Sequence, residues 1–222
     1  MSHLQKNLLI FLKELDKNNN KPWFELHRPE FEEAKANFLA FNIELITKMQ
    51  KMDNSLLGLD PKKTVFRINR DVRFSKDKSP YKNNMGTAMS KGGKNMMTAG
   101  YYFHLQPGNK SFAAIGSYMP EPEILQNIRQ EIDYDLGAFK KIIHAATFKK
   151  YFDGFDDIER LKTVPKGYTI DNPAIEYLKN RSFVVSKYFT DKEVQSPDFL
   201  KELLKCYKAA YPLVLFLHRA EK

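Results

Sequence analysis

The chain has 222 residues, of which 42% are hydrophobic and 13% aromatic, and its formal net charge is +9. This composition is sufficient for a packed core, which excludes a disordered chain. A single cysteine excludes an intrachain disulfide, and the apolar runs are too short to span a bilayer. We therefore expect a cytoplasmic protein with no membrane partner. We expect one domain over residues 1–222, with a helical part at 1–58 and the remainder at 59–222.

The first 58 residues predict helices. Leucine and phenylalanine recur with helical spacing over residues 4–15, and the polar run 16–20 ends that helix. Pro22 suits the first turn of a second helix that continues to about residue 52. Because proline lacks a backbone N–H, Pro29 predicts a break or kink near Arg28.

The middle of the chain predicts strands. Apolar and polar residues alternate over Val65–Phe74, which indicates a strand. Residues Lys76–Met97 lack periodicity and contain several glycines, so we expect a long, partly mobile loop. Gly100–Gln106 and Ser111–Met119 flank a turn-forming Pro-Gly-Asn-Lys sequence and predict a β-hairpin.

The last hundred residues predict mainly helices. Pro122 suits the first turn of one helix, and Asp135 suits the cap of the next. Arg181–Thr190 predicts the last strand, and the final helix contains Pro212, which should bend or break it. No alternating strand–helix series appears. We therefore predict an α+β fold, with a mostly antiparallel sheet of about four or more strands and helices on one face and around its ends.

Positive charge is concentrated in one segment. Residues 62–94 contain ten Lys or Arg and two acids, a net charge of +8, so the other 189 residues sum to about +1. On the predicted strand, Arg67 and Arg73 share a polar face with Asp71, and Arg70 lies on the apolar face. A buried arginine needs a partner, and Asp77 or a carboxylate near the C-terminus is a candidate.

The basic side chains around Arg70 are candidates for binding an anion. Arginine binds phosphate or carboxylate through two-point contacts, and lysine adds charge without that geometry. Nearby tyrosine and phenylalanine side chains suit the stacking of a base. The candidates in this segment are Arg67, Arg73, Lys76, Lys78, Tyr81 and Lys82, with Asp71 and Asp77 in supporting positions.

Other chemistries lack their motifs. The five histidines and Cys206 show no paired spacing for a metal site, and residues 86–94 do not match a phosphate-binding glycine loop. No nucleophile motif appears, and Cys206 falls in an apolar helix where a buried, inert thiol is expected. We predict no metal and no cofactor, and the sequence names no reaction.

Three interpretations of the basic segment stay open beside a simple salt-bridged surface. The first is a pocket for a small phosphorylated or carboxylated anion. The second is a nucleic-acid-binding surface, whose affinity would fall steeply with salt. The third is a partner-binding role in which the loop at 76–97 orders on contact with an acidic partner.

The chain also resembles the domain of unknown function 2461 family of conserved hypothetical proteins. The resemblance spans nearly the whole chain, and its most specific motif is RDVRFSKDKSPYK at residues 70–82. The family has no established activity. The resemblance does imply a set of residues from four segments that would form a site if they converge in space: Asn19, Trp23, Arg28, Arg73, Lys78, Tyr81, Arg129 and Lys166.

Overall fold

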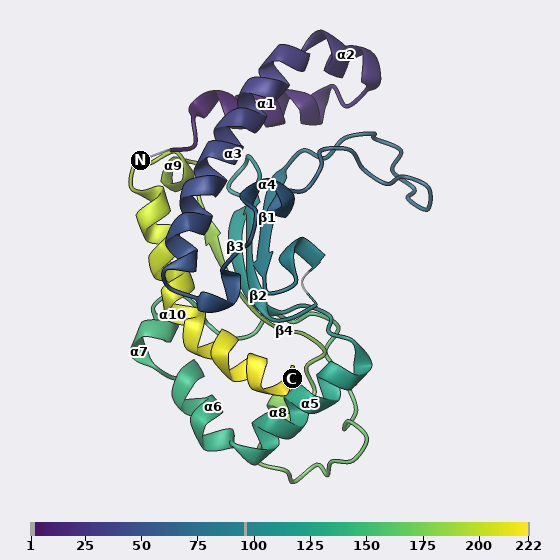
Figure 1. Cartoon of the computed structure of the whole chain (residues 1–222). Coiled ribbons are helices and arrows are strands. Elements are labelled where there is room, and N and C mark those ends of the chain that lie inside the picture. Colours follow the sequence, from purple (N-terminus) through teal and green to yellow (C-terminus); the bar gives the residue numbers. More distant parts are fainter. Residues whose placement is uncertain (1–2, 96, 222) are drawn as a thin grey trace.

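The computed structural model describes residues 3–95 and 97–221 and is built around a four-stranded sheet (Figure 1). Neighbouring strands are antiparallel throughout, in the order β1-β2-β3-β4. The strands are β1 (Met85–Ser90), β2 (Gly100–Leu105), β3 (Ser111–Ser117) and β4 (Phe183–Phe189). The predicted α+β fold with an antiparallel sheet is therefore confirmed.

Helices precede, interrupt and follow the sheet. The α-helices are α1 (Lys6–Lys17), α2 (Lys21–Leu26), α3 (Arg28–Gln50), α4 (Pro61–Thr64), α5 (Pro122–Tyr134), α6 (Leu136–Ile143), α7 (Ala146–Lys149), α8 (Ile175–Leu178), α9 (Asp191–Val194) and α10 (Phe199–Ala220). Two short 3-10 helices are η1 (Asn54–Leu56) and η2 (Gly93–Asn95). The predicted break near Arg28 is confirmed, since α2 ends at Leu26 and α3 begins at Arg28.

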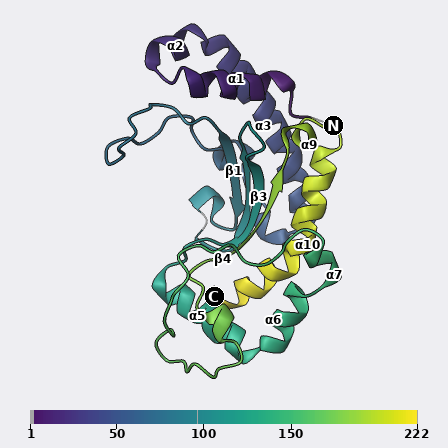
Figure 2. The ribbon, with the colours of Figure 1, turned by 180° about the vertical axis from the view of Figure 1, so that it is seen from behind.

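The two longest helices, α3 and α10, lie side by side over one face of the sheet (Figures 1 and 2). Phe41 of α3 packs against Phe103 of β2 with ring centroids 5.8 Å apart. Tyr101 of β2 packs edge-on against Tyr207 of α10 at 5.2 Å. The alternate residues of β2, β3 and β4 point to the opposite face, where several side chains remain partly exposed.

The predicted hairpin between β2 and β3 is confirmed. The strands pair in register, with Tyr102 opposite Ala114. Gly108 and Asn109 adopt positive φ angles of 84° and 61°, which glycine and asparagine tolerate in a turn. The predicted cap of α6 is also present, because the Asp135 side chain accepts from the Ala138 N–H at 3.1 Å.

The expected bend or break at Pro212 takes the form of a bend, since α10 runs unbroken from Phe199 to Ala220 through this proline and its axis changes direction along its length (Figure 1). Pro212 lies on the exposed side of the helix. Water can therefore hydrogen-bond the carbonyl that loses its partner in the helix, and the packed face stays intact.

The predicted strand over Val65–Phe74 is wrong. Only two isolated bridges form, between Val65 and Thr87 and between Asn69 and Tyr81. A strand needs a continuous ladder of backbone partners, and this segment leaves the edge of β1 after its first residues. Phe74, which alternation placed on an apolar face, is 95% exposed.

The predicted loop over Lys76–Met97 is also wrong, because it contains β1, and all six residues of that strand are buried. The sequence MGTAMS lacks most of the β-branched and aromatic residues that favour strands. Gly86 instead fits closely against a neighbouring side chain, since a Cβ there would lie 2.6 Å from the hydroxyl of Tyr102. A formed strand counts against a role in which this whole segment orders only on binding a partner.

Candidate functional site

The basic segment folds as an irregular hairpin over residues 66–84, which we call the basic hairpin. The Arg70 N–H donates to the Pro80 carbonyl at 2.9 Å, and the Lys82 N–H donates to the Ile68 carbonyl at 2.8 Å. These bonds pair the two arms near their base. The tip, residues 71–79, projects away from the rest of the molecule (Figure 1).

The base of the hairpin is anchored to the N-terminal helices. The Asn19 side chain donates to the Tyr81 carbonyl at 2.9 Å and accepts from the Tyr81 N–H at 3.1 Å. The Tyr81 ring is 6% exposed and stacks on Phe24 with centroids 3.9 Å apart. Burial raises the pKa of the Tyr81 hydroxyl, with the Glu25 carboxylate acting in the same direction. Asn19 and Tyr81 are therefore brought together, and both hold the hairpin in place.

Charges at the tip are paired within the tip. Arg73 binds Asp71 through two side-chain hydrogen bonds of 2.7 and 3.0 Å, which hold the pKa of Asp71 below its usual range. Lys78 donates to the Val72 carbonyl at 3.0 Å. Lys76 lies exposed. Several charged side chains of the tip therefore have their partners within the tip itself.

Arg70 connects the tip to the base. Its guanidinium forms an ion pair with Asp77, one of the two carboxylate partners that were predicted for it. Two hydrogen bonds from Ser79 and the Arg70 guanidinium lower the pKa of Asp77 to about 2. The Arg70 side chain is 25% exposed, so the pair is partly shielded from water.

A pocket of about 350 Å³ lies between the base of the hairpin and the sheet. We call it the base pocket, and its lining residues are Phe66, Arg67, Arg70, Lys82, Asn84, Gly86 and Tyr102. A neighbouring hollow of about 220 Å³ shares Arg70, Lys82 and Asn84 and also exposes the carboxylates of Asp16 and Asp77. The base pocket itself has cationic, amide and aromatic walls and no acidic side chain in its lining.

The cations of the base pocket repel one another. Burial lowers the pKa of the Lys82 ammonium, and the charges of Arg67 and Lys94 lower it further. The Lys82 ammonium also lies over the Phe66 ring, 5.5 Å from its centroid. Within the described part of the chain, no carboxylate lies within 4 Å of Arg67 or Lys82. Neither cation therefore forms a direct ion pair among the described residues, although Asp71 lies within electrostatic range of Arg67.

Aromatic rings continue from the base pocket across the face of the sheet opposite α3 and α10. We call Tyr102, His104, Phe112 and Tyr188 the aromatic ladder. The Tyr102 hydroxyl and His104 Nδ1 are 3.0 Å apart, and His104 Nε2 lies 2.9 Å from the Gln106 amide oxygen. The alternation of GYYFHLQ could have indicated that Tyr102 and His104 share a face, but no local pattern indicates that this face adjoins the basic hairpin.

Two predicted site residues lie elsewhere. Arg129 of α5 donates to the carbonyls of Leu178 and Asn180 at 2.7 and 3.1 Å, and burial lowers the pKa of its guanidinium. Lys166 is exposed in the segment between α7 and α8. That segment and α5 lie at the end of the molecule opposite the basic hairpin in both views (Figures 1 and 2). The structure therefore does not bring Arg129 or Lys166 to the base pocket.

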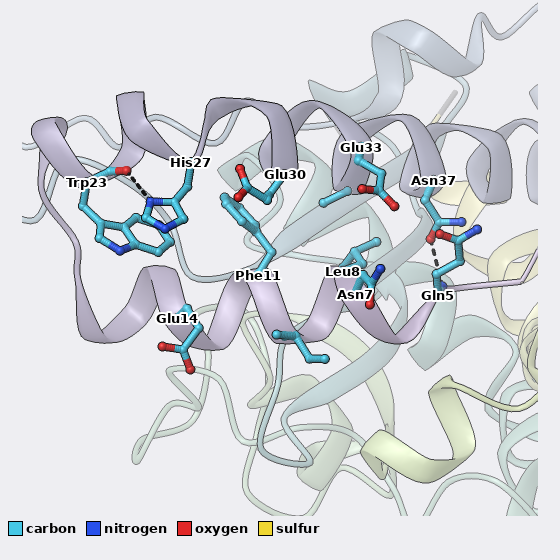
Figure 3. Close-up of a pocket in the computed structure, with 12 residues that line it drawn as sticks. Gln5, Asn7, Leu8, Phe11, Glu14, Trp23, His27, Glu30, Glu33 and Asn37 are labelled. Atoms are coloured by element: carbon cyan, nitrogen blue, oxygen red, sulfur yellow. Dashed lines mark hydrogen bonds between the residues drawn. The ribbon is translucent and has the colours of Figure 1, made fainter.

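Trp23 lines a different hollow, a groove of about 290 Å³ between α1 and α3 (Figure 3). Its indole stacks on His27 with ring centroids 4.0 Å apart. Glu14, Glu30 and Glu33 line the same groove, and none of its lining residues is a lysine or arginine. This groove has the wrong charge for an anion, and Trp23 does not contribute to the base pocket.

Other candidate chemistries find no support in the described residues. Over residues 3–95 and 97–221, no three histidine, cysteine or acidic side chains are grouped so that they could hold a metal ion. Cys206 is buried, and burial raises the pKa of its thiol to about 12, as expected for an unreactive cysteine. No helix in this part of the chain has the length and apolar character needed to cross a membrane.

The fold defines an α+β protein with one four-stranded antiparallel sheet and helices packed over one face. The chain belongs to the family described as conserved hypothetical protein (DUF2461), whose model matches residues 7–216. Comparisons with curated proteins and with solved structures found no significant match.

Proposed function

We propose that the protein binds a small phosphorylated or carboxylated anion in the base pocket. The observation that carries this proposal is that Arg67 and Lys82 line one hollow without a direct ion pair, and that the charges of Arg67 and Lys94 both act on Lys82. Like charges destabilise one another when no counter-charge is present. An anion bound between them would remove this repulsion, so the pocket favours a negatively charged ligand.

The lining side chains suit oxyanion recognition. A guanidinium offers paired donors that match a phosphate or carboxylate, and an ammonium adds a compact charge. Asn84 and the Tyr102 hydroxyl add neutral polar groups in the same hollow. A volume of about 350 Å³ falls at the small end of ordinary ligand sites, which suits a small molecule. No group with the geometry of a nucleophile lines the pocket, so we propose binding and name no reaction.

Inorganic phosphate and citrate are the probes for this proposal. Either anion should raise the pKa of Lys82, because a bound anion stabilises the ammonium. NMR of the Lys82 side chain, recorded over a range of pH with and without the anion, measures this pKa. Arg67→Ala should weaken phosphate binding by about 10-fold or more, as expected for loss of a charge-assisted hydrogen bond.

Lys141→Ala provides the matched control, since Lys141 is an exposed lysine of α6, remote from the basic hairpin. This variant should bind phosphate as the parent protein does. Equal losses in both variants, or a Lys82 signal that ignores both anions, would contradict the proposal.

A further inference from the structure

We propose that the anion held in the base pocket is a phosphate group of single-stranded nucleic acid, whose neighbouring bases pack against the aromatic ladder. This inference rests on the proposed function, because it names the polymer to which the bound anion belongs. It adds a second surface, the face of the sheet that α3 and α10 leave uncovered (Figure 1).

The ladder is fixed by strand register. Gly86 of β1 lies opposite His104 of β2, His104 opposite Phe112 of β3, and Phe112 opposite Tyr188 of β4. The rings of His104 and Phe112 stack with centroids 4.7 Å apart, and those of Phe112 and Tyr188 are 5.4 Å apart. Aromatic groups therefore cross the sheet in a continuous row.

The row remains accessible to a ligand. Tyr102, His104 and Phe112 are partly exposed, and Tyr188 at the end of the row is 64% exposed. Helix packing buries the other face of the same strands, where Tyr101 and Phe103 have no exposure. His104 and Phe112 stack on one another, so the ring most open to an unpaired base is Tyr188 at the exposed end of the row. Because exposed aromatic rings on a sheet face are surfaces on which unpaired bases stack, this face suits single-stranded nucleic acid.

Tyr102 joins the ladder to the base pocket. Its side chain lines that pocket. Its ring lies edge-on to Phe66 with centroids 6.1 Å apart, and its centroid is 5.8 Å from that of Phe112. Burial lowers the pKa of His104 and the Lys82 ammonium lowers it further, which places the pocket charge within electrostatic range of the ladder. Phosphate and base would therefore bind to adjoining parts of one surface.

The dimensions favour an oligonucleotide over a single nucleotide. The row from Gly86 to Tyr188 crosses three strand spacings, or about 14 Å. One nucleotide with its phosphate in the base pocket would leave the end at Tyr188 empty, whereas two or three nucleotides would reach it. The charge distribution agrees, since Arg67, Arg70 and Lys82 line the base pocket at the end of the row where the strand would enter.

The test is fluorescence anisotropy with a labelled eight-nucleotide single strand, as DNA and as RNA, with a duplex of the same sequence for comparison. The single strand should bind with a dissociation constant on the order of micromolar at low salt. Neutralisation of about three phosphates should give a slope near −2 in a plot of log affinity against log salt.

Two ladder variants test the stacking surface. Tyr188→Ala and Phe112→Ala should each weaken single-strand binding by about 5- to 100-fold, the range expected for loss of one stacked base. Tyr188 is largely exposed, so Tyr188→Ala keeps the test valid even where Phe112→Ala disturbs folding. Tyr134→Ala is the matched control, because Tyr134 is 90% exposed at the end of α5, away from the ladder. It should leave binding unchanged.

The outcomes separate this inference from the proposed function. Phosphate binding at Lys82 with no preference for the single strand, with equal duplex affinity, or with no effect of Tyr188→Ala overturns the nucleic-acid inference and leaves the small-anion proposal standing. Absence of both phosphate and single-strand binding overturns both. Single-strand binding that is lost in the ladder variants and kept in Tyr134→Ala supports both.

Discussion

The two ends of the basic hairpin use similar residues in opposite ways. At the tip, Arg73 pairs with Asp71 two residues away, and Asp77 accepts the hydrogen bonds of Ser79 and pairs with Arg70. At the base, Arg67 and Lys82 face a common hollow and lack such a carboxylate among the residues that the structure describes. The tip is largely self-compensated, and the base carries the excess charge.

This difference shows that charge density along a sequence does not locate a charged site. Acids interspersed among the bases cancel charge locally, so the most basic-looking stretch can be electrostatically satisfied. Arg67 and Lys82 are separated by fifteen positions and meet only because the hairpin returns on itself. Uncompensated charge that folding brings together is the stronger indication of an anion site.

The largest expected effect comes from reversing charge at each end of the hairpin. Lys82→Glu and Lys78→Glu change the net charge by the same amount. Lys82→Glu should reduce phosphate affinity by about 100-fold or more, because it removes a cation and gives Arg67 an internal partner. Lys78→Glu at the tip should change affinity by less than about 3-fold. Calorimetric titration with inorganic phosphate measures both.

Equal salt dependence and equal losses in these two variants would mean that only overall charge matters. The base and the tip of the hairpin would then contribute equally to phosphate affinity, which would contradict the proposed difference between them. A loss of affinity confined to Lys82→Glu would support that difference.

The second prediction concerns the anchor of the hairpin base. Asn19→Ala removes both side-chain hydrogen bonds to the Tyr81 backbone, which should destabilise the protein by about 1–2 kcal/mol. The melting temperature should fall by about 3–6 °C, and amide exchange should quicken at Tyr81. Asn7→Ala, at an exposed position of α1, is the control and should change neither.

Local features of the fold were predictable from the sequence. The β2–β3 hairpin followed from alternation and a turn sequence, and the break before α3 followed from proline chemistry. That Arg70 would pair with a carboxylate followed from the cost of an unpaired buried charge, and Asp77 was one of the two candidates. Each of these depends on residues close together in the chain.

Features that depend on distant contacts were not predictable. The strand β1 forms because neighbours accept Gly86 and its small residues, not because MGTAMS favours a strand. The alternation near Phe74 indicated a strand, but no partner ladder exists there. Of the predicted site residues, Arg67 and Lys82 line the base pocket, whereas Arg129 binds backbone carbonyls at the other end of the molecule. Spatial convergence required the sheet register and the path of the hairpin.

A smaller effect is expected from removing the repulsion at the base. Because the pKa of Lys82 is lowered on folding, the unfolded chain binds more protons between the folded pKa and the ordinary value of 10.5. Stability should therefore rise as the pH increases through that interval. Lys82→Met should abolish this rise and increase the melting temperature near neutral pH by about 1–3 °C, while phosphate no longer stabilises the protein. A lower melting temperature would show that Lys82 serves packing more than ligand binding.

The smallest expected effect is the acid titration of the tip, because Asp77 is exposed. Its pKa lies at about 2, below the ordinary value of 3.8, and the hydrogen bonds from Ser79 are the largest cause. A lowered carboxyl pKa gives stability that is present above 3.8 and is lost as the pH falls towards 2. Carboxyl NMR should therefore show Asp77 titrating near pH 2, and Ser79→Ala and Arg70→Ala should each move the midpoint upward. A midpoint near 3.8 in the parent protein would mean that the tip does not hold its charges in pairs, and the contrast between tip and base would then lose its physical cause.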